Sequence, residues 1–171
     1  MKTEPWNTPL RVLLLTYNRH DHWRTTLRES VAGVRKDDAG SIGKAQRARK
    51  GDWVLIRDLS RPGLVLGPPA KVTDRPAMHH DGSSLPKLLW EEERERGLVL
   101  FPLRIPVTFD GTIPVRPERT NWKDLCDIGW RGSGGQFLDT PQRLGKKLAG
   151  NVITEPAEIS ALVALLLRWS S

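Results

Sequence analysis

The feature that most constrains the fold is a series of short apolar segments of β-type composition, broken by proline and glycine. Residues 11–17 (RVLLLTY), 52–58 and 98–109 each predict a strand. Pro62-Gly63 predicts a turn after the 52–58 strand, and a further strand follows that is interrupted by Pro68-Pro69 and resumes as AKVTD. Helices and strands alternate too seldom for a doubly wound sheet, so we expect an α+β fold, a small β-barrel flanked by helices.

Three segments predict helices around the expected barrel. The first covers about 22–32 and ends at Gly33, and the second is a short charged helix over 85–96. The third, over 156–169, begins with a proline in its first turn. Its apolar residues recur on one helical face and should pack on the core; they are Ile159, Leu162, Val163 and Leu166.

Two further segments lack a regular pattern or conflict with one. Residues 35–50, rich in glycine, lysine and arginine, predict a loop. The strand at 98–109 carries two prolines, which predict an edge strand or a bulged one because proline cannot donate to a sheet ladder.

Length and targeting signals predict one soluble domain. The 171 residues fit a single domain over 1–171, with 1–9 as a short N-terminal extension. Cys126 is the only cysteine, which excludes an intrachain disulfide and indicates a reducing compartment. The N-terminus lacks a secretory apolar region, and no apolar run approaches the ~18 residues that span a bilayer. We therefore expect a cytoplasmic protein without a membrane partner.

The charge balance favours a polyanionic partner. Lysine and arginine number 27 against 20 acidic residues, a formal net charge of +7. Four cations precede the apolar strand that opens with Trp53, and they are Lys44, Arg47, Arg49 and Lys50. They predict either contacts with nucleic-acid phosphates or an ordinary solvated loop. Gly51-Asp52 should form the turn that starts the strand.

Tryptophan is unusually frequent, with seven against one tyrosine and three phenylalanines. Trp53 and Trp169 are expected in the core, whereas tryptophans on loops are candidates for stacking on a ligand. Trp122 and Trp130 flank a glycine-rich segment, WRGSGGQF. Glycines allow the backbone to approach a ligand closely. Arg131 or Ser133 would then contact a base edge or a phosphate, the alternative being a surface loop.

The order of several local motifs resembles the EVE domain. In sequence these are LLTYN, a helix, GVRK, KGDWVLI, GPPAKVTD, a tryptophan in a charged segment, FPLRIPV and a WRGS turn. The EVE domain is a PUA-like barrel related to the YTH readers and to the N-terminal DNA-reading domains of McrB-type restriction factors. The resemblance covers roughly residues 10–155, and its most specific parts are KGDWVLI and FPLRIPV.

The resemblance implies a PUA-like small β-barrel whose pocket receives a flipped modified base between aromatic side chains. It gives Trp90 the role of a pocket wall, although the spacing alone favours a helix anchor. Tyr17 and Asn18 would contact the base or cap the following helix. Where YTH relatives have glycine, an apolar residue and tryptophan, this chain has Gly33, Val34 and Arg35. A guanidinium can also stack on a base while donating hydrogen bonds.

These observations define two sets of candidate residues. The expected base pocket comprises Tyr17, Asn18, Val34, Arg35, Trp90, Trp122, Trp130 and Ser133. The expected phosphate contacts are Lys44, Arg47, Arg49, Lys50 and Arg131.

No motif indicates catalysis, a metal or a cofactor. The histidines at 20, 22, 79 and 80 lack a recognised ligand spacing, and a single cysteine excludes zinc-finger sets. There is no P-loop and no nucleophile elbow. The glutamates of the charged helix are expected to face water; they are Glu91, Glu92, Glu93 and Glu95. We expect no catalytic residue and no cofactor, so the chain is not expected to be an enzyme.

The sequence thus predicts a binding module. It would recognise DNA carrying a modified nucleobase, foremost 5-methylcytosine or a related cytosine, by base flipping. It would target a modification-dependent restriction or defence system whose nuclease is a separate subunit or domain. The main alternative is a PUA- or YTH-like reader of modified RNA. An enzyme acting on nucleic acid and a protein-interaction domain are two further alternatives.

Overall fold

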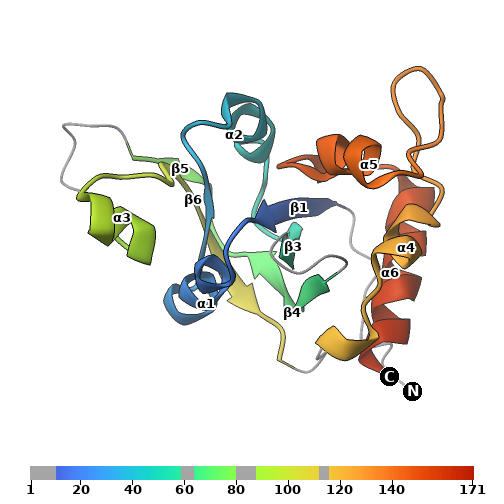
Figure 1. The fold of residues 1–171 in the computed structure, drawn as a ribbon, viewed down its shortest axis with the longest axis horizontal. Coiled ribbons are helices and arrows are strands. Elements are labelled where there is room, and N and C mark those ends of the chain that lie inside the picture. The colour runs from blue at the N-terminus through green and yellow to red at the C-terminus, as the bar shows by residue number, and fades with distance from the viewer. Residues whose placement is uncertain (1–10, 59–63, 80–87, 112–115) are drawn as a thin grey trace.

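The computed structural model describes residues 11–58, 64–79, 88–111 and 116–171. The described part of the chain contains seven strands and seven helical segments (Figure 1). In order they are β1 (Val12–Tyr17), α1 (His20–Glu29), β2 (Val31–Val34), α2 (Ala39–Ala45), β3 (Trp53–Asp58), β4 (Leu64–Val72), β5 (Ala77–Met78), α3 (Glu91–Arg96), β6 (Leu103–Phe109), the 3-10 helix η1 (Pro117–Arg119), α4 (Trp122–Cys126), α5 (Pro141–Leu148), β7 (Val152–Ile153) and α6 (Pro156–Ser170). The predicted 1–9 extension and the Pro62-Gly63 turn lie outside the described residues.

The strands form one curled, mixed sheet, which confirms the α+β class. The strand order is β2-β6-β4-β3-β1-β7, and β5 also pairs with β6. Strands β1 and β3 are parallel, whereas the other pairings are antiparallel. The sheet therefore curls like half a barrel, and its two ends, β2 and β7, are not joined by a described ladder.

Strand β1 is buried on both faces, because its alternate side chains enter two different apolar clusters. Val12 and Leu14 pack with the helices α4, α5 and α6. Leu13 and Leu15 face the concave side of the sheet, where they meet residues of β4 and β6. Successive side chains of a strand point to opposite faces, so an uninterrupted apolar run suits a strand covered on both sides.

The C-terminal helix forms as predicted, and its apolar face is buried. The four residues predicted to pack on the core, Ile159, Leu162, Val163 and Leu166, are all buried. Trp169 is also buried, as expected, and its indole N–H donates to Asp124 at 3.2 Å. Trp53 is only partly buried and packs at the margin of the same cluster.

The prediction of a helix over 22–32 is wrong at its C-terminal end. Helix α1 ends at Glu29, and Ser30 adopts a left-handed conformation with φ of 54°. Residues 31–34 then form β2, which pairs with β6. The predicted loop over 35–50 likewise contains a helix, α2, whose cap Asp38 accepts from the Ser41 N–H at 3.0 Å.

The prolines of β6 predicted an edge strand or a bulged one, but β6 is not at an edge and its described pairings show no register shift. Strand β6 lies between β2 on one side and β4 and β5 on the other. Pro106 falls between the residues that pair with β5 and those that pair with β4, where no donor is required of it. The pair Pro68-Pro69 is accommodated within β4 at a shift in its register with β3.

Candidate functional site

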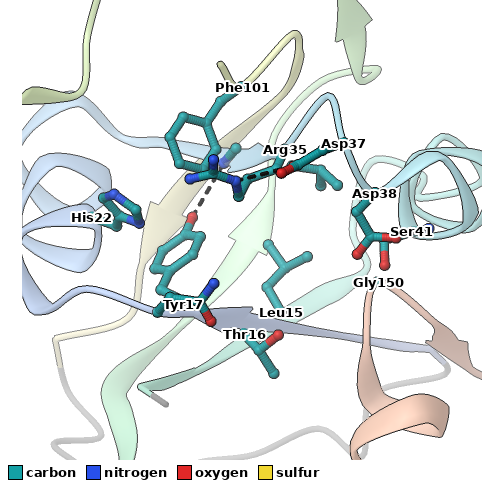
Figure 2. Close-up of a pocket in the computed structure, with 13 residues that line it drawn as sticks. Leu15, Thr16, Tyr17, His22, Arg35, Asp37, Asp38, Ser41, Phe101 and Gly150 are labelled. Carbon is teal, nitrogen blue, oxygen red and sulfur yellow. Dashed lines mark hydrogen bonds and ion pairs between the residues drawn. The ribbon is translucent and has the colours of Figure 1, made fainter. Parts of the chain in front are cut away.

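A cavity of about 300 Å³ opens where strands β1 and β2 approach each other without pairing (Figure 2). Its floor and sides come from β1, β2 and helix α2, and Phe101 and His22 also contribute. The sheet places β2 at one end of the strand order and β1 near the other. The cavity therefore occupies the gap at which the curled sheet fails to close, which we call the open seam.

Main-chain groups of β1 face the open seam. Leu14 accepts from the Gly150 N–H at 3.1 Å and donates to the Asn151 carbonyl at 3.3 Å. The groups of every second residue in a strand point to the same side. The N–H and carbonyl of Thr16 consequently point to the same side as those of Leu14. They lie farther along β1 than the groups that bind residues 150 and 151. A ligand in the cavity would meet these groups as well as side chains.

Tyr17 bridges the open seam from β1 to β2. Its hydroxyl accepts from the Gly33 N–H at 3.2 Å and shares a hydrogen bond with Thr26 Oγ1 at 2.9 Å. Burial raises the pKa of Tyr17 even though these hydrogen bonds act to lower it. Asn18 follows at the end of β1, is exposed, and also lines the cavity. Tyr17 thus fixes the width of the seam as a neutral phenol.

Arg35 presents its guanidinium at the cavity with two of its N–H donors engaged by carboxylates. Its Nε donates to Asp37 at 3.1 Å and its NH1 donates to Glu92 at 2.9 Å. Burial acts to lower the pKa of Arg35, but these hydrogen bonds outweigh it and raise the pKa. Arg35 likewise holds the pKa of Glu92 down, against the effect of burial. The guanidinium is therefore held in place by carboxylates at its edge, while its flat faces form no hydrogen bonds.

Two aromatic rings and a second arginine support Arg35 from behind. The Arg35 guanidinium carbon lies 5.6 Å from the centre of the Phe101 ring. Phe101 packs on Trp90 with ring centroids 4.5 Å apart. The guanidinium carbon of Arg104 lies 5.5 Å from the centre of the Trp90 ring. Phe101 and Trp90 are 1% and 0% exposed. The four side chains form a layered stack, and only Arg35, with 27% of its side chain exposed, reaches the solvent side.

Glu93 organises the backbone that carries the aromatic layers. Its two oxygens accept the N–H groups of Leu89, Trp90, Leu100 and Phe101 at 2.9–3.3 Å. Arg104 NH2 lies 3.4 Å from the same carboxylate. Glu93 is completely buried and Glu92 nearly so. The prediction that the glutamates of this helix face water is therefore wrong for these two, although Glu91 and Glu95 are exposed.

His22 is a buried cavity residue that the sequence analysis did not select. It is 1% exposed and makes edge contacts with the rings of Tyr17 and Phe101 at 5.9 and 5.0 Å. Its Nε2 lies 3.3 Å from Glu92 but has no hydrogen-bond partner of suitable geometry among the described residues. Burial lowers the pKa of His22 despite the nearby carboxylates of Asp21 and Glu92. The imidazole is therefore neutral at neutral pH.

Four of the five predicted phosphate-binding residues lie at or just after the C-terminal end of helix α2, one wall of the cavity. Lys44 lies in the last turn of α2, and the three exposed cations after it form what we call the cationic segment, Arg47, Arg49 and Lys50. Among the described residues, none of these four forms an ion pair, whereas Arg19, Arg28 and Arg168 all do. The segment ends in the predicted turn: Gly51 has φ of 95°, and the Asp52 carboxylate accepts from the Arg49 N–H at 2.8 Å.

The structure brings together only part of the expected base pocket. Tyr17, Asn18, Val34 and Arg35 all line the cavity. Trp90 lies behind it instead: its ring fills the space beside Gly33, where an added Cβ would lie 2.6 Å from the indole. The indole N–H of Trp90 donates to the His22 carbonyl at 3.3 Å. Trp90 thus supports the wall as an anchor, the role that the spacing also predicted.

The other three expected pocket residues lie elsewhere. Trp130 is completely buried in the cluster beneath α6 and donates to the Leu125 carbonyl at 2.6 Å. Trp122 begins α4, which packs against α6 at the opposite side of the molecule from α3 (Figure 1). Ser133 is exposed, and Arg131 lies over the ring of Phe137. The glycine-rich segment therefore belongs to a separate surface.

The described residues offer neither a metal site nor a membrane-spanning helix. No three histidine, cysteine, aspartate or glutamate side chains of the described part are grouped so that they would hold a metal ion. None of the described helices is both long and apolar enough to cross a bilayer. No protein-family model matches the chain, and no curated protein matches its sequence.

Proposed function

We propose that this protein is a PUA-like reader of the EVE type that binds DNA carrying a modified base, with the base flipped into the open seam. The observation that carries the proposal is that one helix, α2, lines the cavity and leads directly into the cationic segment. A base and its own backbone phosphates lie a few ångströms apart, so a base pocket and a phosphate-binding surface must be neighbours.

The charges around the cavity favour a neutral base inside and phosphates outside. The charge of Arg35 is offset by Asp37 and Glu92, and Asp38 adds a further carboxylate at the cavity. A phosphate would meet this excess of acid, whereas carboxylates accept hydrogen bonds from an exocyclic amine such as that of cytosine. The cationic segment outside the cavity forms no ion pair with a described carboxylate and supplies the attraction for phosphates.

Arg35 provides the stacking surface that tryptophan provides in YTH relatives. Its guanidinium is planar, two carboxylates hold it in place and part of it is exposed, so a flat face can stack on a base. Leu15 and Val34 also line the cavity and offer apolar contact to a methyl group. A methyl group recognised by apolar contact contributes roughly 1–3 kcal/mol, so the preference for a modified base should be modest.

The proposal is tested by a panel of duplexes that differ at one base. The duplexes carry cytosine, 5-methylcytosine, 5-hydroxymethylcytosine or methyladenine, and a matched RNA completes the panel. We expect the tightest binding to a modified cytosine in DNA. Equal affinity for all duplexes would refute the reader, and preference for modified RNA would replace it by an RNA reader.

Variants of two arginines test the pocket. Arg35→Ala should abolish the preference for the modified base, and Arg35→Lys should not restore it because an ammonium offers no plane for stacking. Arg96→Ala is the matched control: Arg96 also pairs with Glu92, at 3.0 Å, but does not line the cavity. Loss of preference in both variants would assign the effect to Glu92 instead of the stacking face.

The proposed role is binding without cleavage, with a separate nuclease. Incubation of the protein with modified DNA and magnesium should yield no shortened products. Products that disappear when a chelator is added would overturn this part of the proposal in favour of a nuclease.

A further inference from the structure

Residues 130–138 form a short hairpin that stands apart from the cavity. Arg131 and Phe137 pair as an antiparallel bridge, and the Leu138 N–H donates to the Trp130 carbonyl at 2.9 Å. Figure 1 shows this segment projecting as a loop between α4 and α5. No residue of the hairpin lines the cavity. Whatever the hairpin contacts, it does so independently of a ligand in the open seam.

The hairpin presents an aromatic ring to solvent next to its buried base. Phe137 is 51% exposed, the largest value among the large apolar side chains that the structure describes as exposed. The guanidinium carbon of Arg131 lies only 3.7 Å from the centre of its ring. Because Arg131 covers one face of the ring, the exposed half of the side chain includes the opposite face.

The hairpin holds this ring in a fixed arrangement. Arg131 donates to the Gly135 carbonyl at 2.9 Å, which keeps its guanidinium over the ring. Lys147 donates to the Arg131 carbonyl at 2.9 Å and is itself paired with Glu158. At the base of the hairpin, Trp130 and Leu138 are buried in the core. An aromatic side chain that is ordered before binding loses little entropy when a ligand stacks on it.

The surroundings of Phe137 select the kind of partner. The tip consists of glycine, serine and glutamine, so the ring is isolated and does not belong to a broad apolar patch. The adjacent helix α5 carries the exposed cations Arg143 and Lys146, of which Arg143 also pairs with the exposed Asp139 at 3.8 Å. A single ring beside positive charge suits a planar group on a polyanion, since unpaired bases stack on aromatic side chains while their phosphates meet cations.

We infer that the hairpin is a second nucleic-acid contact site, at which an unpaired base stacks on the free face of Phe137. The inference rests on the proposed function only in taking nucleic acid as the partner. Because stacking on an aromatic ring is largely insensitive to base identity, this site adds affinity without adding selectivity for the modification.

The test compares Phe137→Ala with Phe137→Trp and with Leu167→Ala. Leu167 is 38% exposed on α6 and is the control for loss of an exposed apolar side chain. The probes are an unmodified single-stranded oligodeoxynucleotide and two duplexes, with and without 5-methylcytosine. Phe137→Ala should weaken binding of the single strand roughly 5- to 150-fold, the range that corresponds to one stacked base. Phe137→Trp and Leu167→Ala should retain it.

The same measurements separate this inference from the reader proposal. Phe137→Ala should leave the affinity ratio between the two duplexes unchanged. If the Phe137→Ala protein binds the single strand as tightly as the wild-type protein does, the hairpin site is refuted. This holds even if the wild-type protein prefers the modified duplex. Conversely, a wild-type protein that does not prefer the modified duplex would refute the reader proposal. The hairpin site would still be upheld if, among the three variants, only Phe137→Ala weakened binding of the single strand.

Discussion

Replacing Glu93 by glutamine should destabilise the protein far more than any other glutamate-to-glutamine change on helix α3. The carboxylate is completely buried and accepts four main-chain N–H groups, and Arg104 lies against it. Glutamine keeps the shape but places an NH2 group opposite N–H donors and leaves Arg104 without its counter-charge. Breaking one member of a buried charged pair costs about 3–5 kcal/mol of unfolding free energy.

This loss is measured by denaturant unfolding or by the thermal midpoint. For a chain of this size, 1 kcal/mol shifts the midpoint by roughly 2–4 °C, so we expect a decrease of roughly 6–20 °C. Glu91→Gln is the control, because Glu91 is exposed in the first turn of the same helix and forms no ion pair with a described residue; its interaction with the helix dipole is worth about 0.3–1 kcal/mol. A Glu93→Gln protein within about 1 kcal/mol of wild type would refute the assignment of Glu93 as the organiser of this segment.

Three further predictions follow from individual residues. Gly33→Ala should cost about 1–3 kcal/mol of unfolding free energy by overpacking against Trp90, and strict additivity with Trp90→Phe in a double-mutant cycle would exclude that contact as the cause. Because burial lowers the pKa of His22 in the folded state, the unfolded chain binds this proton first, and stability should fall as the pH drops below about 6.5. His22→Gln should flatten that decline between pH 7.5 and 5 in unfolding titrations, leaving the share due to His79, whose pKa burial also lowers; an unchanged slope would contradict the assignment. Alanine at all three positions of the cationic segment should weaken binding to every duplex about equally. The triple variant should also reduce the slope of log affinity against log salt by up to about 0.9 for each phosphate that is no longer neutralised. An unaltered slope would show that the segment is an ordinary solvated loop.

The elements that the sequence predicted well are those whose pattern is local. Strands β1 and β3 are uninterrupted apolar runs whose side chains enter both clusters, and helix α6 buries the face on which its apolar residues recur. Strand β2 was missed because its four residues continue the pattern of the preceding helix, and only pairing with β6 makes them a strand. Serine at a left-handed helix end is a weak signal, so Gly33 appeared to be the better stop.

The cavity residues that the resemblance places near strand ends were predicted. The residues whose role depends on burial among other elements were missed. Tyr17 and Arg35 were named from the sequence and line the cavity. Glu93 was assigned to water because a charged helix has the same pattern whether its carboxylates meet solvent or main-chain N–H groups. One signal was present: Glu93 is the third residue of α3, where glutamate often accepts from the helix start. No local signal distinguishes the buried Phe101 or His22, whose neighbours come from other elements.

The pairing of β1 with β7 also determines when the sheet can be completed during synthesis. Val12 pairs with Ile153, and the apolar outer face of β1 is covered by α6, so both partners emerge from the ribosome long after β1 does. Until then the outer face of β1 remains exposed as an apolar strand, a form prone to pairing with other chains. A ribosome-bound chain that stops before residue 150 should accordingly be sensitive to protease across β1, and protection should appear only when α6 has left the exit tunnel.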